Sequence, residues 1–121
     1  MRISLEELFI HRQYANHPIY YYFDRKTYTI CPADLLEQNQ DVPYVRYIPL
    51  FQHNNEEMQN EYIQRFMGKK AWMDYKESTF CFEEFMQRNR KWDSWWDFYY
   101  KSVCDFARKW CIENHIAFSE V

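Results

Sequence analysis

The sequence predicts an α+β fold: an N-terminal helix and a small antiparallel three-stranded sheet, followed by a helical C-terminal half with a long, aromatic-faced last helix. Three observations carry this prediction. Two β-branched and aromatic runs flank a polar turn near residue 25, and beyond residue 54 apolar residues recur three and four positions apart. With 121 residues, 47% of them hydrophobic, the chain can form one core, so we expect a single domain, with helix and sheet over about 1–50 and helices over about 54–116.

The N-terminal elements are predicted from capping and turn signals. Ser4 followed by Glu7 is a capping box, which predicts a helix from about residue 5 toward Ala15. The runs 19–23 and 28–31 read as a hairpin around the turn 24–27, although no glycine specifies the turn type.

A third strand is predicted at 44–48, after a polar connection over 37–41. Pro43 and Pro49 flank this strand, so we expect it to be short and to lie at an edge of the sheet.

The helical half begins with a second capping signature. Asn54 with Glu57 predicts a helix that ends at Gly68, the only glycine, in a left-handed cap. Shorter helical pieces are predicted around 72–75 and over about 79–89.

The last helix shows the clearest pattern. At 100° per residue, one arc gathers the residues expected in the core, and acids and lysines descend the opposite side. The expected core residues are Trp92, Trp95, Trp96, Tyr99, Val103, Phe106 and Trp110. Asp97 with Lys101, and Asp105 with Lys109, are expected ion pairs, and the helix should end near Asn114.

The order of elements resembles a bacterial family of unassigned function, the uncharacterised protein family numbered 158 in the UPF series. The likeness spans nearly the whole chain and rests mostly on core aromatics and element boundaries. It is carried by Tyr21 to Asp24, Arg46 to Pro49, Tyr62 to Phe66, Phe82 to Phe85 and the closing Ala107 to Ile116. Where family members have glycines, this sequence has Thr27 and the Ser78-Thr79 pair. The resemblance implies a fold and no reaction, cofactor or catalytic residue.

Composition and spacing argue against several classes of function. The net charge of −3 disfavours binding that depends chiefly on phosphate neutralisation. The acidic start and the lack of an 18-residue apolar run predict a cytoplasmic protein without a membrane span. One glycine disfavours phosphate loops and nucleophile elbows, so we expect no enzyme and no cofactor. Four cysteines without a CxxC pair, and the isolated pair Cys111 and His115, predict free thiols and no metal.

One group of basic residues has aromatics interleaved, a pattern that can pair with phosphates and stack bases. Its members, called the basic cluster, are Arg65, Lys69, Lys70, Trp72, Arg88, Arg90 and Lys91. The other reading is that these cations complement helix dipoles while the tryptophan is core, and that reading is favoured.

Some aromatics are candidates for an interface, namely Tyr20, Tyr22, Phe98 and Tyr100. Phe98 lies near the charged side of the last helix, so we expect it to be exposed or covered by the N-terminal segment, the sheet included.

Three hypotheses follow for function. The first is a binding or regulatory module directed at another protein, small inhibitor proteins included, and either monomeric or homodimeric. The second is an RNA or single-stranded nucleic-acid binder that uses the basic cluster. The third is a small metal-dependent hydrolase that uses Glu57 or Glu61.

Overall fold

The computed structural model describes residues 1–37 and 45–121 and confirms the α+β fold class. The chain forms two compact units. The sheet unit comprises Met1–His53 and Val103–Val121, and the helical unit comprises Asn54–Ser102. The division after His53 falls where the sequence predicts the change from sheet to helices, whereas residues 103–116, predicted to belong to the helical part, are in the sheet unit. The single domain stays a prediction. Within the described ranges, no helix has the length and apolar character that crossing a membrane requires.

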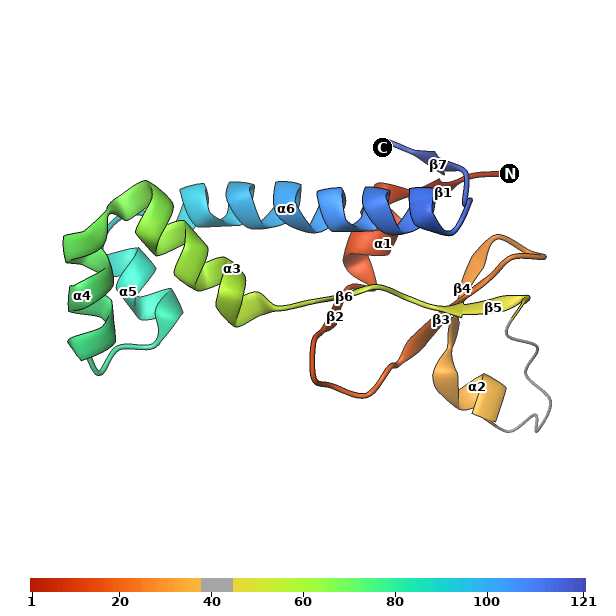
Figure 1. Ribbon diagram of the computed structural model, residues 1–121, viewed down its shortest axis with the longest axis horizontal. Coiled ribbons are helices and arrows are strands. Elements are labelled where there is room, and N and C mark those ends of the chain that lie inside the picture. Colours follow the sequence, from red (N-terminus) through yellow and green to blue (C-terminus); the bar gives the residue numbers. More distant parts are fainter. Residues whose placement is uncertain (38–44) are drawn as a thin grey trace. The chain divides into compact units, whose positions relative to one another are not determined.

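The antiparallel three-stranded sheet of the sheet unit is confirmed (Figure 1). Its strands are β3 (Tyr21–Asp24), β4 (Thr29–Pro32) and β5 (Tyr47–Pro49), in the order β4-β3-β5. The third strand is an edge strand, as predicted, but it begins later than residue 44. Residues 38–41 of the predicted polar connection, and Tyr44, lie outside the described residues.

A buried carboxylate organises the hairpin turn in place of a glycine. Asp24 Oδ1 accepts a hydrogen bond from Lys26 N, and the carboxylate binds Arg46, the residue before β5, through two hydrogen bonds of 2.9 Å. These hydrogen bonds, that from Arg46 first, hold the pKa of Asp24 well below its ordinary value. Tyr28 takes φ 56°, the left-handed conformation that glycine would otherwise supply. The side chain of Asp24 therefore ties the end of β3 to the turn and to the residue that precedes β5.

Each edge of this sheet carries a proline that faces outward. Ala33 N donates to Tyr20 O, and Leu50 N donates to Tyr21 O, so these nitrogens point toward β3. Because backbone directions alternate along a strand, the nitrogens of Pro32 and Pro49 point away from β3. Proline has no N–H, so its place at an outward position costs the sheet no hydrogen bond.

The side chain of Gln13 completes the sheet where β3 and β5 separate. Its Oε1 accepts hydrogen bonds from Tyr20 N at 2.6 Å and Tyr21 N at 3.0 Å, and its Nε2 donates to Leu50 O at 3.3 Å. The amide thus joins Tyr21 N to Leu50 O, the two groups that an antiparallel pair would join directly. Gln13 is buried, so this bridge satisfies backbone groups that water does not reach easily.

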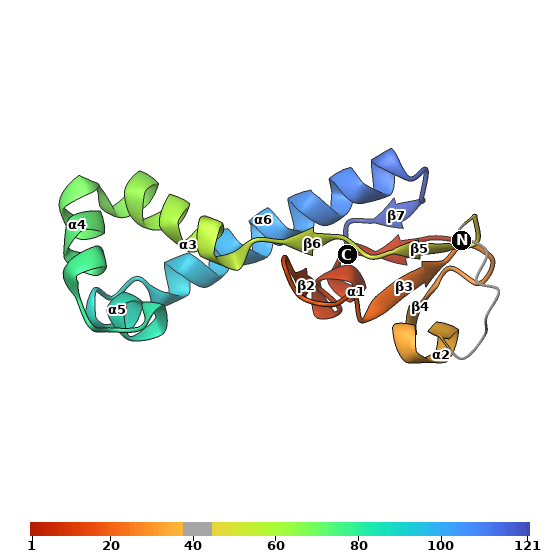
Figure 2. The same cartoon turned by 60° about the horizontal axis from the view of Figure 1, so that its bottom comes forward.

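Two short parallel strand pairs were not predicted. Strand β1 (Ile3–Ser4) pairs with β7 (Phe118–Ser119), which lies beside it in Figure 2, and β2 (Gln13–Tyr14) pairs with β6 (Gln52–His53). The second pair corrects the length of the first helix. Helix α1 (Leu5–Ile10) begins at the predicted Ser4 cap but ends before residue 15, because the chain leaves it to form β2.

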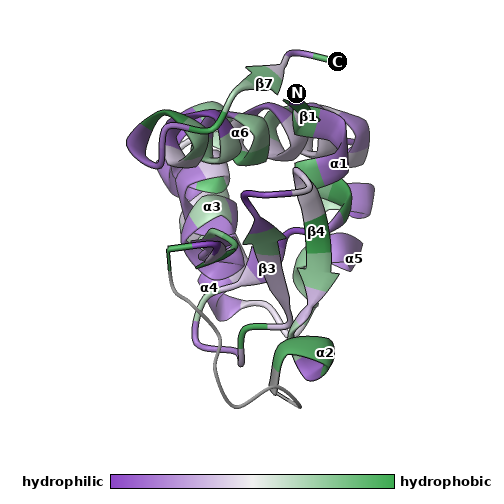
Figure 3. Ribbon diagram, turned by 90° about the vertical axis from the view of Figure 1, so that its right-hand side faces the viewer, coloured by the Kyte–Doolittle hydropathy of each residue, from purple (hydrophilic) through white to green (hydrophobic). Residues whose placement is uncertain are grey.

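A short helix, α2 (Ala33–Glu37), was also missed by the sequence analysis. It follows β4 directly and buries Ala33 and Leu36, while Leu35 is exposed. Most of its ribbon has the green of hydrophobic residues in Figure 3. Five residues are too few to show helical periodicity, which is why the pattern did not predict it.

In the helical unit the predicted boundaries are largely right. Helix α3 (Asn55–Tyr62) begins after the predicted cap, with Asn54 Oδ1 accepting from Glu57 N at 3.0 Å. Helix α4 (Lys69–Glu77) is longer than predicted, and α5 (Phe82–Arg88) starts later than residue 79 because Cys81 is its N-cap.

Between α3 and α4 lies a π-helix, η1 (Ile63–Met67), which ends at Gly68 as predicted. Gly68 N donates to Ile63 O at 3.0 Å, the five-residue step of a π-turn. The predicted left-handed cap is wrong, because Gly68 has φ 93° and ψ 172°. That conformation is essentially restricted to glycine, so the need for glycine here is stronger than a left-handed cap would impose.

The long last helix, α6 (Trp92–Glu113), is confirmed, but its predicted buried arc is too wide. Trp95 and Tyr99 are buried in the helical unit, and Val103 in the sheet unit. Trp96 and Phe106, both expected in the core, are 40% and 44% exposed. The predicted arc of seven residues is wider than the surface that neighbouring elements cover, so the residues at its edges are exposed to solvent.

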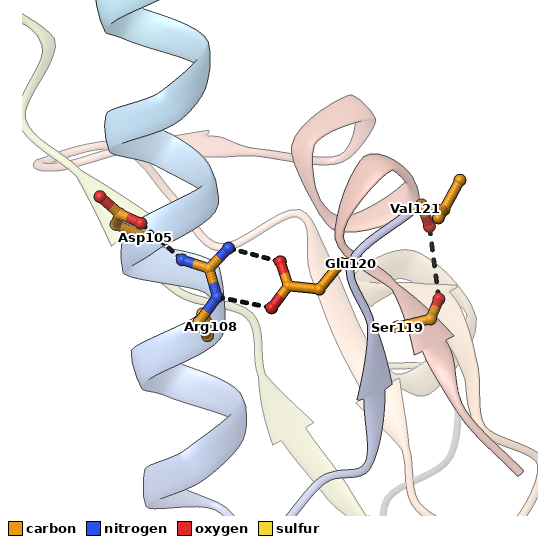
Figure 4. Close-up of polar contacts among 5 residues, drawn as sticks. All are labelled: Asp105, Arg108, Ser119, Glu120 and Val121. Carbon is orange, nitrogen blue, oxygen red and sulfur yellow. Dashed lines mark hydrogen bonds and ion pairs between the residues drawn. The ribbon is translucent and has the colours of Figure 1, made fainter.

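The charges of α6 pair partly as predicted. Lys101 Nζ lies 3.1 Å from Asp97, which confirms that pair. The pair Asp105 with Lys109 is wrong, because Asp105 binds Arg108 instead, and Arg108 also forms a bidentate pair with Glu120 (Figure 4). Hydrogen bonding to Arg108 lowers the pKa of Glu120, and Arg108 thereby ties the segment that carries β7 to α6.

Candidate functional site

The basic cluster occupies three places in the helical unit. Arg65 is in η1, Lys69, Lys70 and Trp72 are in α4, and Arg88, Arg90 and Lys91 are at and beyond the end of α5. No hydrogen bond, ion pair or ring contact among the described residues joins its α4 members to those after α5. The convergence of the two groups on one patch stays a prediction.

Local structure explains several members of the basic cluster. Arg65 pairs with Glu61 at 3.8 Å, and Arg88 pairs with Glu84 at 3.3 Å, so neighbouring acids neutralise both. Arg90 has φ 57°, and Lys91 N donates to Met86 O at 2.8 Å, which closes the end of α5.

The other cations of the basic cluster are exposed and have no ion-pair partner within residues 1–37 and 45–121. They are Lys69, Lys70, Arg90 and Lys91. The aromatic member, Trp72, is half-buried and lies under Lys76, with Nζ 5.2 Å from the ring centroid. The cluster therefore offers solvated charge but no open aromatic face for a base.

The predicted interface aromatics differ in exposure. Tyr20 is 54% exposed and Tyr100 is 40% exposed, whereas Tyr22 and Phe98 are half-buried. Phe98 is covered, but not by the N-terminal segment that was expected to cover it. Within the helical unit its ring lies 5.4 Å from Tyr62 and 5.5 Å from Phe66, so α3 and η1 cover it.

An exposed aromatic surface lies along α6 and was only partly found from sequence. We call Trp92, Trp96 and Tyr100, four residues apart on α6, the aromatic stripe. Trp96 and Tyr100 are each 40% exposed, and Trp92 is half-buried. Sequence analysis assigned Trp92 and Trp96 to the core because they share an arc with Trp95 and Tyr99. The signal that would have separated them is Asp93, which the helical spacing places on the side of Trp96.

The aromatic stripe stands on rings that are themselves fixed. Trp96 contacts Trp92 edge to face at 6.0 Å and 89°, and Tyr99 at 5.4 Å and 84°. The buried Trp95 contacts Tyr99 at 5.4 Å and Phe82 of α5 at 4.7 Å. A chain of ring contacts therefore runs from the core of the helical unit to Trp96 and favours the orientation that the exposed ring adopts.

Two carboxylates border the aromatic stripe. Asp93 and Asp97, which we call the acidic edge, lie three residues before Trp96 and Tyr100 respectively, so each shares a helix face with an exposed ring. Asp97 pairs with Lys101. Asp93 is exposed and has no ion-pair partner in the described part of the chain.

The acid pair proposed for hydrolysis lies on the surface of α3. Glu57 and Glu61 line a shallow depression of about 460 Å³ with Asn60, Gln64 and Arg65. All five residues come from the continuous stretch of α3 and η1, so among the described residues no other part of the chain lines the depression. Across the described residues, no three His, Cys, Asp or Glu side chains are close enough to share a metal ion.

The remaining metal candidate, Cys111 with His115, has its two members in different surroundings. Cys111 is fully buried and His115 is exposed. Burial raises the pKa of the Cys111 thiol to about 11, which disfavours the thiolate that a metal requires.

Comparison of the chain with protein-family models, curated proteins and solved structures gives no match. The resemblance to the uncharacterised family therefore stays a prediction, and the argument for function rests on the geometry of the aromatic stripe.

Proposed function

We propose that this protein is a binding module that recognises another protein through the aromatic stripe of α6. The observation that carries the proposal is that Trp96 and Tyr100 are each 40% exposed, whereas their neighbours Trp95 and Tyr99 on the same helix are buried. Tryptophan and tyrosine are enriched at protein interfaces because each supplies a large contact area. Small inhibitor proteins that cover a site on their target are one form of such a module.

The fixed orientation of Trp96 supports the proposal. The contacts of Trp96 with Trp92 and Tyr99 restrict the rotamers that this surface ring can adopt before any partner arrives. Binding then costs less conformational entropy than binding through a mobile side chain, which is how preorganised surfaces gain affinity.

A comparison of two variants tests the proposal. Wild-type protein, a Trp96→Ala, Tyr100→Ala variant and a Phe80→Ala control would each be used to capture partners from the cells that make the chain. Phe80 is a suitable control because it is an aromatic residue of the same unit and is 36% exposed. We expect one dominant protein to be retained by wild type and control and its affinity for the double variant to fall at least about tenfold. Equal retention by the double variant would refute a role for the aromatic stripe.

Nucleic-acid binding is the second candidate, supported by the solvated charge at Lys69, Lys70, Arg90 and Lys91. A charge-reversed variant, Lys69→Glu with Lys70→Glu, tests it directly. If the basic cluster binds RNA, retention should weaken steeply with salt and be lost in this variant. RNA retained equally at high salt would exclude phosphate contacts as its cause.

A further inference from the structure

In the helical unit, lysine or arginine side chains of the chain lie over three aromatic rings. Arg65 lies over the ring of Phe66 at 5.0 Å, Lys76 over Trp72 at 5.2 Å, and Arg88 over Phe80 at 4.2 Å. Such a contact pairs a positive charge with the negative face of the ring. The sequence places these partners locally, one to eight residues apart.

Trp96, which is 40% exposed, differs from these three rings. In the described ranges, no lysine or arginine lies over the ring of Trp92 or Trp96, whose contacts are with other rings. The residues that share the face of Trp96 at helical spacing are Trp92, Asp93 and Tyr100, and none carries a positive charge. The chain therefore leaves Trp96, a partly exposed tryptophan, without the kind of cation that it places over Phe66, Trp72 and Phe80.

The acidic edge decides which kind of group suits this face. Asp93 carries a negative charge without an ion-pair partner in the described part of the chain, and Asp97 adds a second carboxylate that Lys101 offsets. A carboxylate next to an aromatic face repels phosphate and acidic side chains and attracts guanidinium or ammonium. A cation over Trp96 would therefore have the ring below it and Asp93 beside it.

We propose that the partner is a protein segment that places an arginine or lysine over Trp96, with its charge paired to Asp93. This inference rests on the proposed function, because it names the chemistry of the partner for the same surface. Apolar side chains of the segment contact Trp92 and Tyr100 on either side of the cation. A guanidinium suits the position better than an ammonium, since its plane stacks on the indole while its edge donates to the carboxylate.

The test uses two synthetic helical peptides that differ only in charge. One carries leucine and arginine on one face, and in the other each arginine is replaced by citrulline, its neutral analogue. Binding to the full chain is followed by titration of the indole N–H resonances of Trp92 and Trp96. We expect the arginine peptide to bind about tenfold more tightly, with a preference that shrinks as salt is raised.

Two charge variants locate the effect. Asp93→Asn should weaken the arginine peptide about three- to tenfold and leave the citrulline peptide unchanged. Asp74→Asn is the matched control, because Asp74 is an exposed aspartate of the same unit without an ion-pair partner among the described residues, and it should change neither affinity. Far-UV circular dichroism confirms that α6 is intact in both variants.

Several results would overturn the inference. Equal affinity for the two peptides, failure of both to bind, or shifts confined to tryptophans other than Trp92 and Trp96 would each do so. The proposed function fails separately, when the Trp96→Ala, Tyr100→Ala variant still retains the captured protein. A partner lost by that variant but retained by Asp93→Asn would show that the aromatic stripe binds a protein by apolar contacts alone.

Discussion

We expect that removing the amide of Gln13 will destabilise the sheet unit more than the loss of any other uncharged polar side chain described in that unit. Gln13→Met keeps the length of the side chain and removes its donor and both of its acceptor contacts. Two backbone N–H groups, of Tyr20 and Tyr21, and the carbonyl of Leu50 then lose their partner. Each buried backbone group left unsatisfied costs about 1–3 kcal/mol.

The expected total follows from the exposure of these groups. Tyr20 is the more exposed residue, so water replaces part of its lost hydrogen bond, whereas Leu50 is buried. We therefore expect the free energy of unfolding of the sheet unit to fall by about 3 kcal/mol. Gln52→Met is the matched control, because Gln52 makes one exposed hydrogen bond, from Nε2 to His17 O, and its loss should cost less than about 0.5 kcal/mol.

Hydrogen exchange at the amide of the buried Phe23 measures this change within the sheet unit, while urea unfolding measures the whole chain. Both probes are needed because the chain forms two compact units, whose unfolding need not coincide. Equal destabilisation by Gln13→Met and Gln52→Met, or a loss below about 0.5 kcal/mol for Gln13→Met, would refute the bridging role of the amide.

Three further predictions concern single positions. Burial lowers the pKa of His53 from 6.5 to about 4, so the neutral ring is favoured in the folded state. The free energy of unfolding should therefore fall as the pH falls from 6.5 toward 4. Urea unfolding of the His53→Gln variant should lack this part of the pH dependence. Gly68→Ala should cost about 1–3 kcal/mol in thermal unfolding although the added Cβ meets nothing within 4 Å, whereas Lys69→Ala should be nearly neutral. Iodoacetamide followed by mass spectrometry should modify the exposed Cys81 first and the buried Cys111, whose pKa is raised to about 11, last; equal rates would contradict the burial of Cys111.

Local signals account for what the sequence could predict of the fold. The caps at Ser4 and Asn54 each involve a side chain and a backbone N–H three residues apart, so their pattern is visible in the chain. The hairpin and α6 are likewise continuous segments with one strong period. The pairs β1-β7 and β2-β6 are two residues long and join distant segments, so no local pattern could predict them.

The candidate site was harder to predict for a similar reason. Helical periodicity groups Trp95 and Trp96 together, because they are only 100° apart. The packing of Tyr62 of α3 and Phe82 of α5 against Trp95 separates the buried ring from the exposed one. The ion pair of Asp24 with Arg46 was missed because it spans 22 residues, with no spacing rule to link its members. Sequence therefore identified the aromatic residues of α6 but not which of them face solvent.

The outward prolines of the sheet unit limit the ways in which this protein can bind others. An incoming strand pairs with a sheet edge through alternating backbone donors and acceptors, and Pro32 on one edge and Pro49 on the other each remove a donor from that series. A strand that paired with either edge over these positions, whether from a second copy or from a peptide, would lose one hydrogen bond there. The prolines therefore disfavour backbone pairing at both edges and leave side-chain contacts as the better way for a partner to bind this unit.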